Sequence, residues 1–148
     1  AIAITLSEKC PIWEMTATDK SNEALKIAKL NTNNEINFYC GDWFDAVPDE
    51  KFDLIVSNPP YIDDHDPHLD NLKYEPLEAL TSGSNGLDDI RIIINESPKY
   101  LKEGGYLLLE HGFNQQKEII GLLKESFFNI NTYKDLNDID RAVLAQYR

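Results

Sequence analysis

The chain has 148 residues and a formal net charge of −12, and its 42% apolar and 27% charged residues are typical of one globular domain. No apolar run approaches the roughly 20 residues of a membrane-spanning helix, and no charged start precedes an apolar stretch with a cleavage site, so we expect neither membrane insertion nor secretion. Cys10 and Cys40 are too few for a disulfide framework and predict reduced thiols in a cytoplasmic protein. The acidic balance argues against direct nucleic-acid binding and favours a small-molecule site or a positively charged protein partner.

Strand-like and helix-like segments alternate along the chain, which predicts an α/β domain with a mostly parallel sheet. In chain order we expect a helix at residues 1–8, a strand at 13–18, a helix at 21–30, strands at 36–40 and 52–57, a short helix at 77–80, a helix at 88–102, a strand at 106–110, a helix at 114–125, and strands at 127–133 and 142–147. Ser21 is a suitable N-cap for the second helix. The apolar run at 52–57 predicts a strand buried on both faces, and the last two strands are expected to pair antiparallel.

Four of the expected strands end in polar residues, and parallel strands place their carboxyl ends along one edge of a sheet. These residues are Asp19, Asp42, Asn58 and Glu110-His111. A carboxylate accepts hydrogen bonds from both hydroxyls of a ribose, and a carboxylate beside an indole, as in Asp42-Trp43, suits an adenine with its exocyclic amine. Helix capping explains such aspartates more often, so each one alone is weak evidence for a ligand.

The sequence Asn58-Pro59-Pro60-Tyr61 follows the expected strand at 52–57 and offers acceptors in a fixed direction. Because proline has a fixed φ and no N–H, the carbonyls of Asn58 and Pro59 are held rigidly, and the Asn58 side chain adds another acceptor. Two acceptors held close together suit a planar NH₂ group, and Tyr61 gives a flat face on which an amide or a base stacks. Hydrogen bonds to both N–H groups orient such a poorly nucleophilic nitrogen toward an electrophile without a strong general base.

The same tetrapeptide resembles the fourth motif of S-adenosylmethionine-dependent methyltransferases that act on planar nitrogens. Further motifs follow in order, namely GDWF at 41–44, VSNPPYID at 56–63, DPHL at 66–69, YEPL at 74–77 and LLLEHG at 107–112. Together they resemble the PrmC/HemK family of release factor glutamine methyltransferases over essentially the whole chain. The resemblance implies a Rossmann-like class I methyltransferase fold. It also implies methylation of the glutamine side-chain amide in the Gly-Gly-Gln motif of peptide-chain release factors.

The resemblance implies roles for individual residues. The implied cofactor-binding residues are Asp19, Asp42, Trp43 and Asn58, and the implied catalytic residues are Asn58, Pro59, Pro60 and Tyr61. Asp19 would bind the ribose of S-adenosylmethionine, and Asp42 with Trp43 its adenine region. Glu75 and Pro76 would shape a lid over the site, and residues 110–112 would support its floor.

The chain departs from the family in its glycines. The family's cofactor loop is a GxGxG turn after the first strand, whereas the seven glycines here include no GxG pair. Ala1 is expected inside the helix that follows that loop, so we expect residues 1–148 to be an N-terminally truncated catalytic domain, without the first strand, the glycine-rich loop and the N-terminal helical substrate-binding domain. We therefore expect weak or absent cofactor binding, no activity from this chain alone, and unpaired backbone groups on the strands beside the gap.

Other functions stay open. The tetrapeptide also serves amino methyltransferases of adenine or guanine in nucleic acids, although a flipped base requires a phosphate-tracking groove and the net charge of −12 counts against one. A non-catalytic scaffold that has lost its cofactor loop is a second alternative. We expect no metal at the histidines and aspartates of residues 63–70, because no cysteine lies near them. We expect His111 to make a structural hydrogen bond rather than act as a base.

Overall fold

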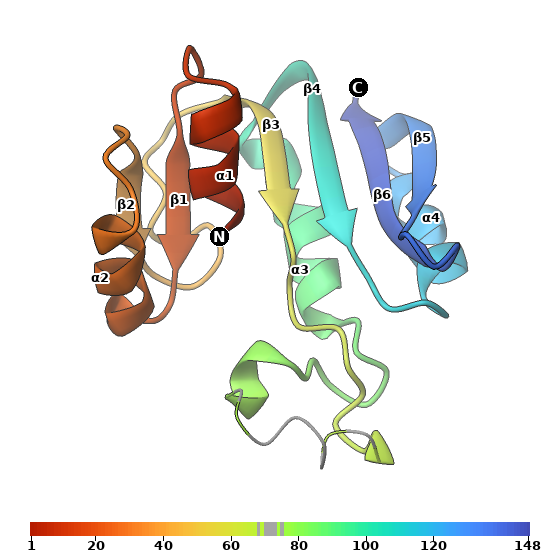
Figure 1. Ribbon diagram of the computed structural model, residues 1–148. Coiled ribbons are helices and arrows are strands. Elements are labelled where there is room, and N and C mark those ends of the chain that lie inside the picture. The colour runs from red at the N-terminus through yellow and green to blue at the C-terminus, as the bar shows by residue number, and fades with distance from the viewer. Residues whose placement is uncertain (68, 70–73, 75) are drawn as a thin grey trace. The chain divides into compact units, whose positions relative to one another are not determined.

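The computed structural model describes residues 1–67, 69, 74 and 76–148, which form two compact units, Ala1–Glu50 and Lys51–Arg148. The first unit contains α1 (Ile2–Lys9), β1 (Thr16–Asp19), α2 (Asn22–Leu30) and β2 (Asn37–Cys40) (Figure 1). The second unit contains β3 (Phe52–Ser57), the 3₁₀ helix η2 (Leu77–Ala79), α3 (Asp88–Glu96), the 3₁₀ helix η3 (Ser97–Lys99), β4 (Leu101–Glu110), α4 (Gln116–Leu123), β5 (Phe127–Lys134) and β6 (Asp140–Tyr147). The predicted order of helices and strands is confirmed. None of the described helices has the length and apolar character that crossing a bilayer requires.

In the first unit, β1 and β2 pair in parallel, with Asp19 opposite Cys40 at the carboxyl end. The helix α2 begins at its predicted cap, because the Ser21 hydroxyl oxygen accepts a hydrogen bond from the Ala24 N–H at 3.1 Å. This helix packs against both strands and buries Leu25. Parallel pairing therefore brings the ends of β1 and β2 to the same edge, as the sequence predicts.

The second unit is a four-stranded sheet in the order β3-β4-β6-β5. The strands β3 and β4 are parallel, and the predicted antiparallel pairing of the last two strands is confirmed. The helices α3 and α4 contact each other, and both lie behind the sheet in Figure 1. The core consists of apolar side chains that are at most 3% exposed, namely Leu87, Ile90, Ile93, Ile94, Leu101, Leu107, Leu109, Ile119, Leu123, Phe127, Val143 and Ala145.

The prediction that residues 52–57 are buried on both faces is wrong. Asp53 is exposed, and the other residues of β3 are half-buried. In the neighbouring β4, Leu107 and Leu109 are buried, whereas Tyr106 is 39% exposed. Because α3 and α4 lie on one face of this sheet, alternate residues of its strands have no helix of the unit over them (Figure 1).

The boundary between α3 and β4 also differs from the prediction. The helix α3 ends at Glu96 and not at residue 102, and Pro98 lies in the 3₁₀ turn that follows. Proline has no N–H for the helical ladder, so the α-helical hydrogen bonding is interrupted at Pro98. Leu101 already pairs with β3, and an irregularity in the pairing precedes Tyr106. The two glycines at 104–105 therefore lie within β4 and do not precede it.

Four strands have an unpaired edge among the described residues, namely β1 and β2 in the first unit and β3 and β5 in the second. Among the described strands, β1 pairs with β2 alone and β3 pairs with β4 alone. The unpaired backbone groups that the sequence leads us to expect beside a missing strand stay a prediction.

Candidate active site

The turn at residues 58–61 lies beyond the carboxyl end of β3, where the connection to α3 begins (Figure 1). Asn58 is exposed, whereas Pro59 is buried. No residue that the structure describes forms a hydrogen bond with the Asn58 side chain or with the carbonyl oxygens of Asn58 and Pro59. The predicted acceptors are therefore not engaged in hydrogen bonds with other described residues.

The ends of β3 and β4 lie side by side, as the sequence predicts for neighbouring parallel strands. Ser57 pairs with Leu109, so Asn58 and Glu110 follow at adjacent positions of the same sheet edge. The Tyr61 hydroxyl donates a hydrogen bond to Glu110 Oε1 at 3.0 Å. The side chain of Tyr61 is thus fixed from the end of β4.

Burial raises the pKa of the Tyr61 hydroxyl above its ordinary value. The hydrogen bond to Glu110 and the negative charge of that carboxylate raise this pKa further, and the positive charge of Arg141 opposes the shift. The hydroxyl therefore remains protonated at neutral pH and donates to the carboxylate. The hydrogen bond to Glu110 restricts the orientation of its ring.

The main chain of Tyr61 is held by a second group of contacts. Gln115 Nε2 donates to the carbonyl oxygen of Tyr61 at 2.9 Å, and the same amide lies 3.1 Å from the carbonyl oxygen of Asn85 and 3.2 Å from that of Gly86. Gln115 Oε1 accepts a hydrogen bond from the Gly112 N–H at 2.8 Å. We call these four contacts the Gln115 network.

Ile62, which follows Tyr61, forms backbone hydrogen bonds with residues 80–82 of the same connection between β3 and α3. Ile62 donates its N–H to the carbonyl oxygen of Leu80 and accepts from the N–H of Ser82, which forms a parallel bridge with Thr81. The chain leaving the turn is therefore bonded along its backbone within the second unit.

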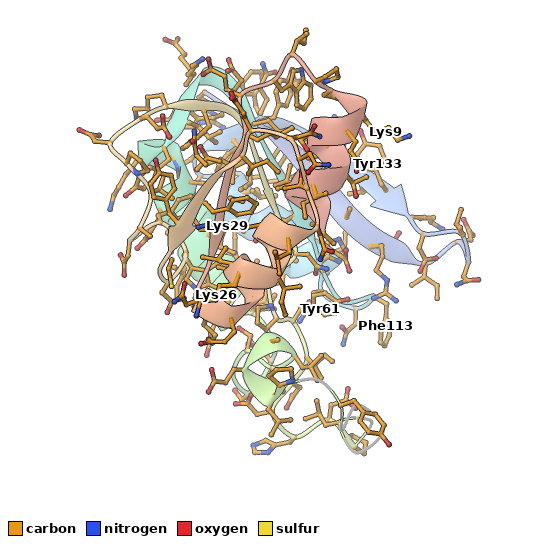
Figure 2. The ribbon with its side chains drawn as sticks, turned by 60° about the vertical axis from the view of Figure 1, so that its left-hand side comes forward. Lys9, Lys26, Lys29, Tyr61, Phe113 and Tyr133 are labelled. Carbon is orange, nitrogen blue, oxygen red and sulfur yellow. The ribbon has the colours of Figure 1, made fainter. Side chains whose placement is uncertain are left out.

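A cleft of about 370 Å³ lies beside the turn within the second unit. Its walls include Tyr61, Asp63, Phe113 and Arg141. Phe113 is 67% exposed, and both it and Tyr61 are labelled in Figure 2. An aromatic side chain and charged groups thus line an open space beside Tyr61.

His111 is fully buried, and its Nδ1 lies 2.8 Å from the carbonyl oxygen of Gly112. A carbonyl only accepts, so Nδ1 bears the proton in this contact. The other ring nitrogen, Nε2, has no hydrogen-bond partner among the described residues. The predicted structural hydrogen bond of His111 is confirmed.

The implied cofactor-binding aspartates lie together in the first unit. Asp19 and Asp42 are exposed, and the Gly41 N–H donates to the Asp19 carbonyl oxygen at 3.2 Å, which joins the two strand ends. Asp19 also has a capping role, because its Oδ1 accepts from the Ser21 N–H at 2.8 Å. Trp43 has a φ of 44°, an uncommon conformation for a bulky residue, so the backbone that directs this indole is strained.

Exposed carboxylates at the ends of two paired strands suit a ribose and an adenine chemically. The residues of the first unit therefore fit the group that the sequence implies. The turn at 58–61 belongs to the second unit. That the two groups of residues form one site stays a prediction.

Some of the residues considered from the sequence lie outside the described part of the chain. Among them are Glu75 of the expected lid, and His68 and Asp70 of the loop considered for a metal. Pro76 is exposed and precedes η2. Among residues 1–67, 69, 74 and 76–148, no group of three or more His, Cys, Asp and Glu side chains is placed to hold a metal ion.

Neither Gln115 nor Gly86 is predicted from the sequence as a residue of the site. Gln115 precedes a helix, and its contacts with Tyr61 and Gly86 join residues that are 54 and 29 positions away. No local pattern marks a glutamine that bonds at such separations. The one local feature at Gly86 is its place shortly before the helix predicted to begin at residue 88.

A family model described as the methyltransferase small domain matches residues 1–75 of the chain. The chain is 45% identical over 151 residues to the release factor glutamine methyltransferase of Coxiella burnetii, covering 99% of the chain and 54% of that relative. It is 40% identical over 154 residues to the protein of the same name from Shewanella oneidensis, again covering 99% of the chain and 54% of the relative. The chain thus spans about half the length of the curated relatives it matches.

Solved structures show the same fold. A methyltransferase from Pyrococcus furiosus superposes with a TM-score of 0.67 at 16% identity, covering 96% of this chain and 66% of that one. The N-methyltransferase NodS from Bradyrhizobium japonicum, in complex with S-adenosyl-l-homocysteine, gives a TM-score of 0.62 at 20% identity, covering 99% and 72%. The predicted Rossmann-like class I methyltransferase fold is confirmed. By the match to its family model, the chain belongs to the methyltransferase small domain family.

Proposed function

We propose that the protein methylates the glutamine side-chain amide in the Gly-Gly-Gln motif of peptide-chain release factors, with S-adenosylmethionine as the methyl donor. The observation that carries this proposal is the turn at residues 58–61. Its acceptors make no hydrogen bond to another described residue, and its tyrosine is fixed at both its hydroxyl and its carbonyl. The names of the curated relatives support release factors as the substrate.

The amide would bind through its two N–H groups. The carbonyl oxygens of Asn58 and Pro59, together with Asn58 Oδ1, accept these hydrogen bonds, and Pro60 keeps the turn rigid because it has a fixed φ. The ring of Tyr61 stacks on the planar amide. These contacts orient the nitrogen, and the proton becomes acidic only after the nitrogen is alkylated, so the turn needs no strong base.

S-Adenosylmethionine, when bound, supplies an electrophilic methyl group. Asp19 would accept hydrogen bonds from its ribose hydroxyls, since one of its carboxylate oxygens is not used in the contact with Ser21. Asp42 would accept from the adenine amine beside the indole of Trp43. Asn58 would lie between the cofactor and the substrate amide.

A protein substrate agrees with the charge of the chain. The net charge of −12 disfavours a nucleic-acid backbone and favours a partner with positive charge. Peptide-chain release factors act in the cytoplasm, where we place this protein as well.

The proposal is tested by mapping the methyl group. The full-length protein is incubated with S-adenosylmethionine bearing an isotopically labelled methyl group and, in separate reactions, with a release factor, duplex DNA and ribosomal RNA. We expect label in the release factor alone, on the Gly-Gly-Gln glutamine in peptide mass spectra. A release factor with that glutamine replaced by alanine is the matched control. Label in a nucleic acid, or in no substrate, would contradict the proposal.

A further inference from the structure

Gln115 is a buried polar side chain whose contacts converge on the turn. It is 7% exposed, and its amide has two protons that face three carbonyl oxygens, those of Tyr61, Asn85 and Gly86. Its oxygen accepts from the Gly112 N–H. Buried polar groups of this kind are costly unless they are bonded, so the four contacts hold their segments together strongly.

The base of this network is rigid. Gln115 is the N-cap residue of α4, and its N–H donates to the Gly112 carbonyl oxygen at 3.1 Å, so main chain and side chain both join these two residues. The helix α4 is anchored in the core by Ile119 and Leu123, which are fully buried. The side chain of Gln115 therefore extends from a fixed support.

The absence of a side chain at Gly86 leaves room for the Gln115 network. Its φ is +66°, which favours glycine, and a Cβ there would clash with the carbonyl oxygen of Tyr61 and lie 2.7 Å from Gln115 Nε2. A side chain at this position would thus separate the amide of Gln115 from the turn. The hydrogen bond between Gln115 and Tyr61 therefore depends on the glycine at position 86.

We propose that Gln115 is a positioning residue, which fixes the main chain at Tyr61 so that the preceding acceptors of Asn58 and Pro59 keep their direction. This inference rests on the function proposed above for the turn. Glu110 fixes the Tyr61 hydroxyl from β4, and Gln115 fixes the Tyr61 carbonyl from α4. The two contacts come from different elements, so neither alone determines the position of the turn.

The test replaces Gln115 with a side chain of similar length that forms no such hydrogen bonds. In Gln115→Met, we expect kcat for the release factor to fall about 10- to 100-fold, since small displacements of a reacting group have effects of that order. The KM for S-adenosylmethionine should change less than kcat, because the hydrogen bonds of the Gln115 side chain are to Tyr61, Asn85, Gly86 and Gly112 and none is to a proposed cofactor residue. The matched control is Gln116→Met, which removes the neighbouring glutamine and its hydrogen bond to Asp140.

A spectroscopic readout separates positioning from a general structural role. Tyrosine labelled with ¹³C at Cζ is titrated by NMR, and the Tyr61 signal is identified by its loss in Tyr61→Phe. We expect Gln115→Met to move the Tyr61 titration toward that of an ordinary tyrosine, and Gln116→Met to leave it in place. A folded Gln115→Met variant with unchanged Tyr61 titration and unchanged kcat would overturn the inference.

A second pair of variants approaches the network from the opposite side, in case Gln115→Met does not fold. Gly86→Ala should change the Tyr61 titration and kcat in the same direction, whereas Gly121→Ala should change neither, because no atom lies within 4 Å of a Cβ there. If the wild-type protein transfers no methyl group to a release factor, the proposed function is overturned, and the Tyr61 titration still tests the Gln115 network. If both Gly86→Ala and Gln115→Met leave that titration unchanged, the inference is overturned whatever the activity.

Discussion

Tyr61 contacts the rest of the second unit through both its side chain and its main chain. Its hydroxyl donates to Glu110, and its carbonyl oxygen accepts from Gln115. Burial is the largest cause of the raised pKa of this hydroxyl, followed by the bond to Glu110. The protonated tyrosine is therefore part of what stabilises the turn.

This raised pKa predicts how stability depends on pH. The unfolded chain loses the tyrosine proton near the ordinary value of 10.0, whereas the folded chain retains it to higher pH. The stabilisation by Tyr61 is thus fully present below pH 10 and is lost as the pH rises through the raised pKa. We expect the free energy of unfolding, from urea titrations, to fall more steeply above pH 10 in the wild type than in Tyr61→Phe. Parallel curves would contradict the assignment.

The sequence predicted the turn better than it predicted the contacts that hold it. Two consecutive prolines restrict the backbone wherever they occur, so the direction of the acceptors at Asn58 and Pro59 follows from local chemistry. The contacts of Tyr61 join residues 49 and 54 positions away, and they depend on how β4 and α4 pack. Local sequence contains no signal for such pairs.

The start of α2 is an element whose stability has a definable local cause. Ser21 accepts from the Ala24 N–H, and it donates its own N–H to Asp19. Removing such a cap typically costs about 1 kcal/mol. We expect Ser21→Ala to lower the free energy of unfolding by about that amount in denaturant titrations, because the N–H of Ala24 loses its acceptor.

The matched control for this prediction is Ser84→Ala, which changes an exposed serine in the connection between β3 and α3. That variant should stay within about 0.5 kcal/mol of the wild type. Equal stability of Ser21→Ala and Ser84→Ala would mean that the cap does not contribute.

The helices α2 and α3 and the strand β3 show which local features of the sequence predict an element correctly and which do not. Ser21 marked the start of α2 correctly because capping is a local effect. The end of α3 was misplaced because apolar spacing continues to Leu101, although Pro98 has already ended the helix and Leu101 pairs with β3. Burial on both faces of β3 was also misjudged, since an apolar run does not tell on which face the helices pack.

The apolar core is distributed unequally between the two units. In the described part of Ala1–Glu50, the buried apolar side chains are those of Leu25 and Phe44, whereas the second unit has most of the fully buried ones. Little buried apolar area gives a low free energy of local opening. We expect native-state hydrogen exchange to be faster for the amides of β1 and β2 than for those of β4 and β6. Equal protection in both pairs would contradict this account.

We expect cofactor affinity to depend on a glycine-rich loop, which the glycines of this chain do not provide. The family's loop brings backbone N–H groups close to the cofactor, and the sequence contains no GxG pair that would allow such an approach. We expect isothermal titration of the 148-residue chain with S-adenosylmethionine to show weak binding or none. A micromolar Kd would contradict this expectation and would mean that Asp19, Asp42 and Trp43 bind the cofactor without that loop.

In the proposed function, Asn58 and Pro59 hold a planar NH₂ group for methylation. The most direct test of this role is the turnover of Asn58→Ala in the full-length protein with a release factor, beside Asn137→Ala as a control at an exposed asparagine between β5 and β6. We predict that Asn58→Ala lowers kcat by about 100-fold or more, as for the loss of a preorganised hydrogen-bonding group, without changing the melting temperature. Asn137→Ala should keep the wild-type kcat. Wild-type turnover by a folded Asn58→Ala variant would contradict the account.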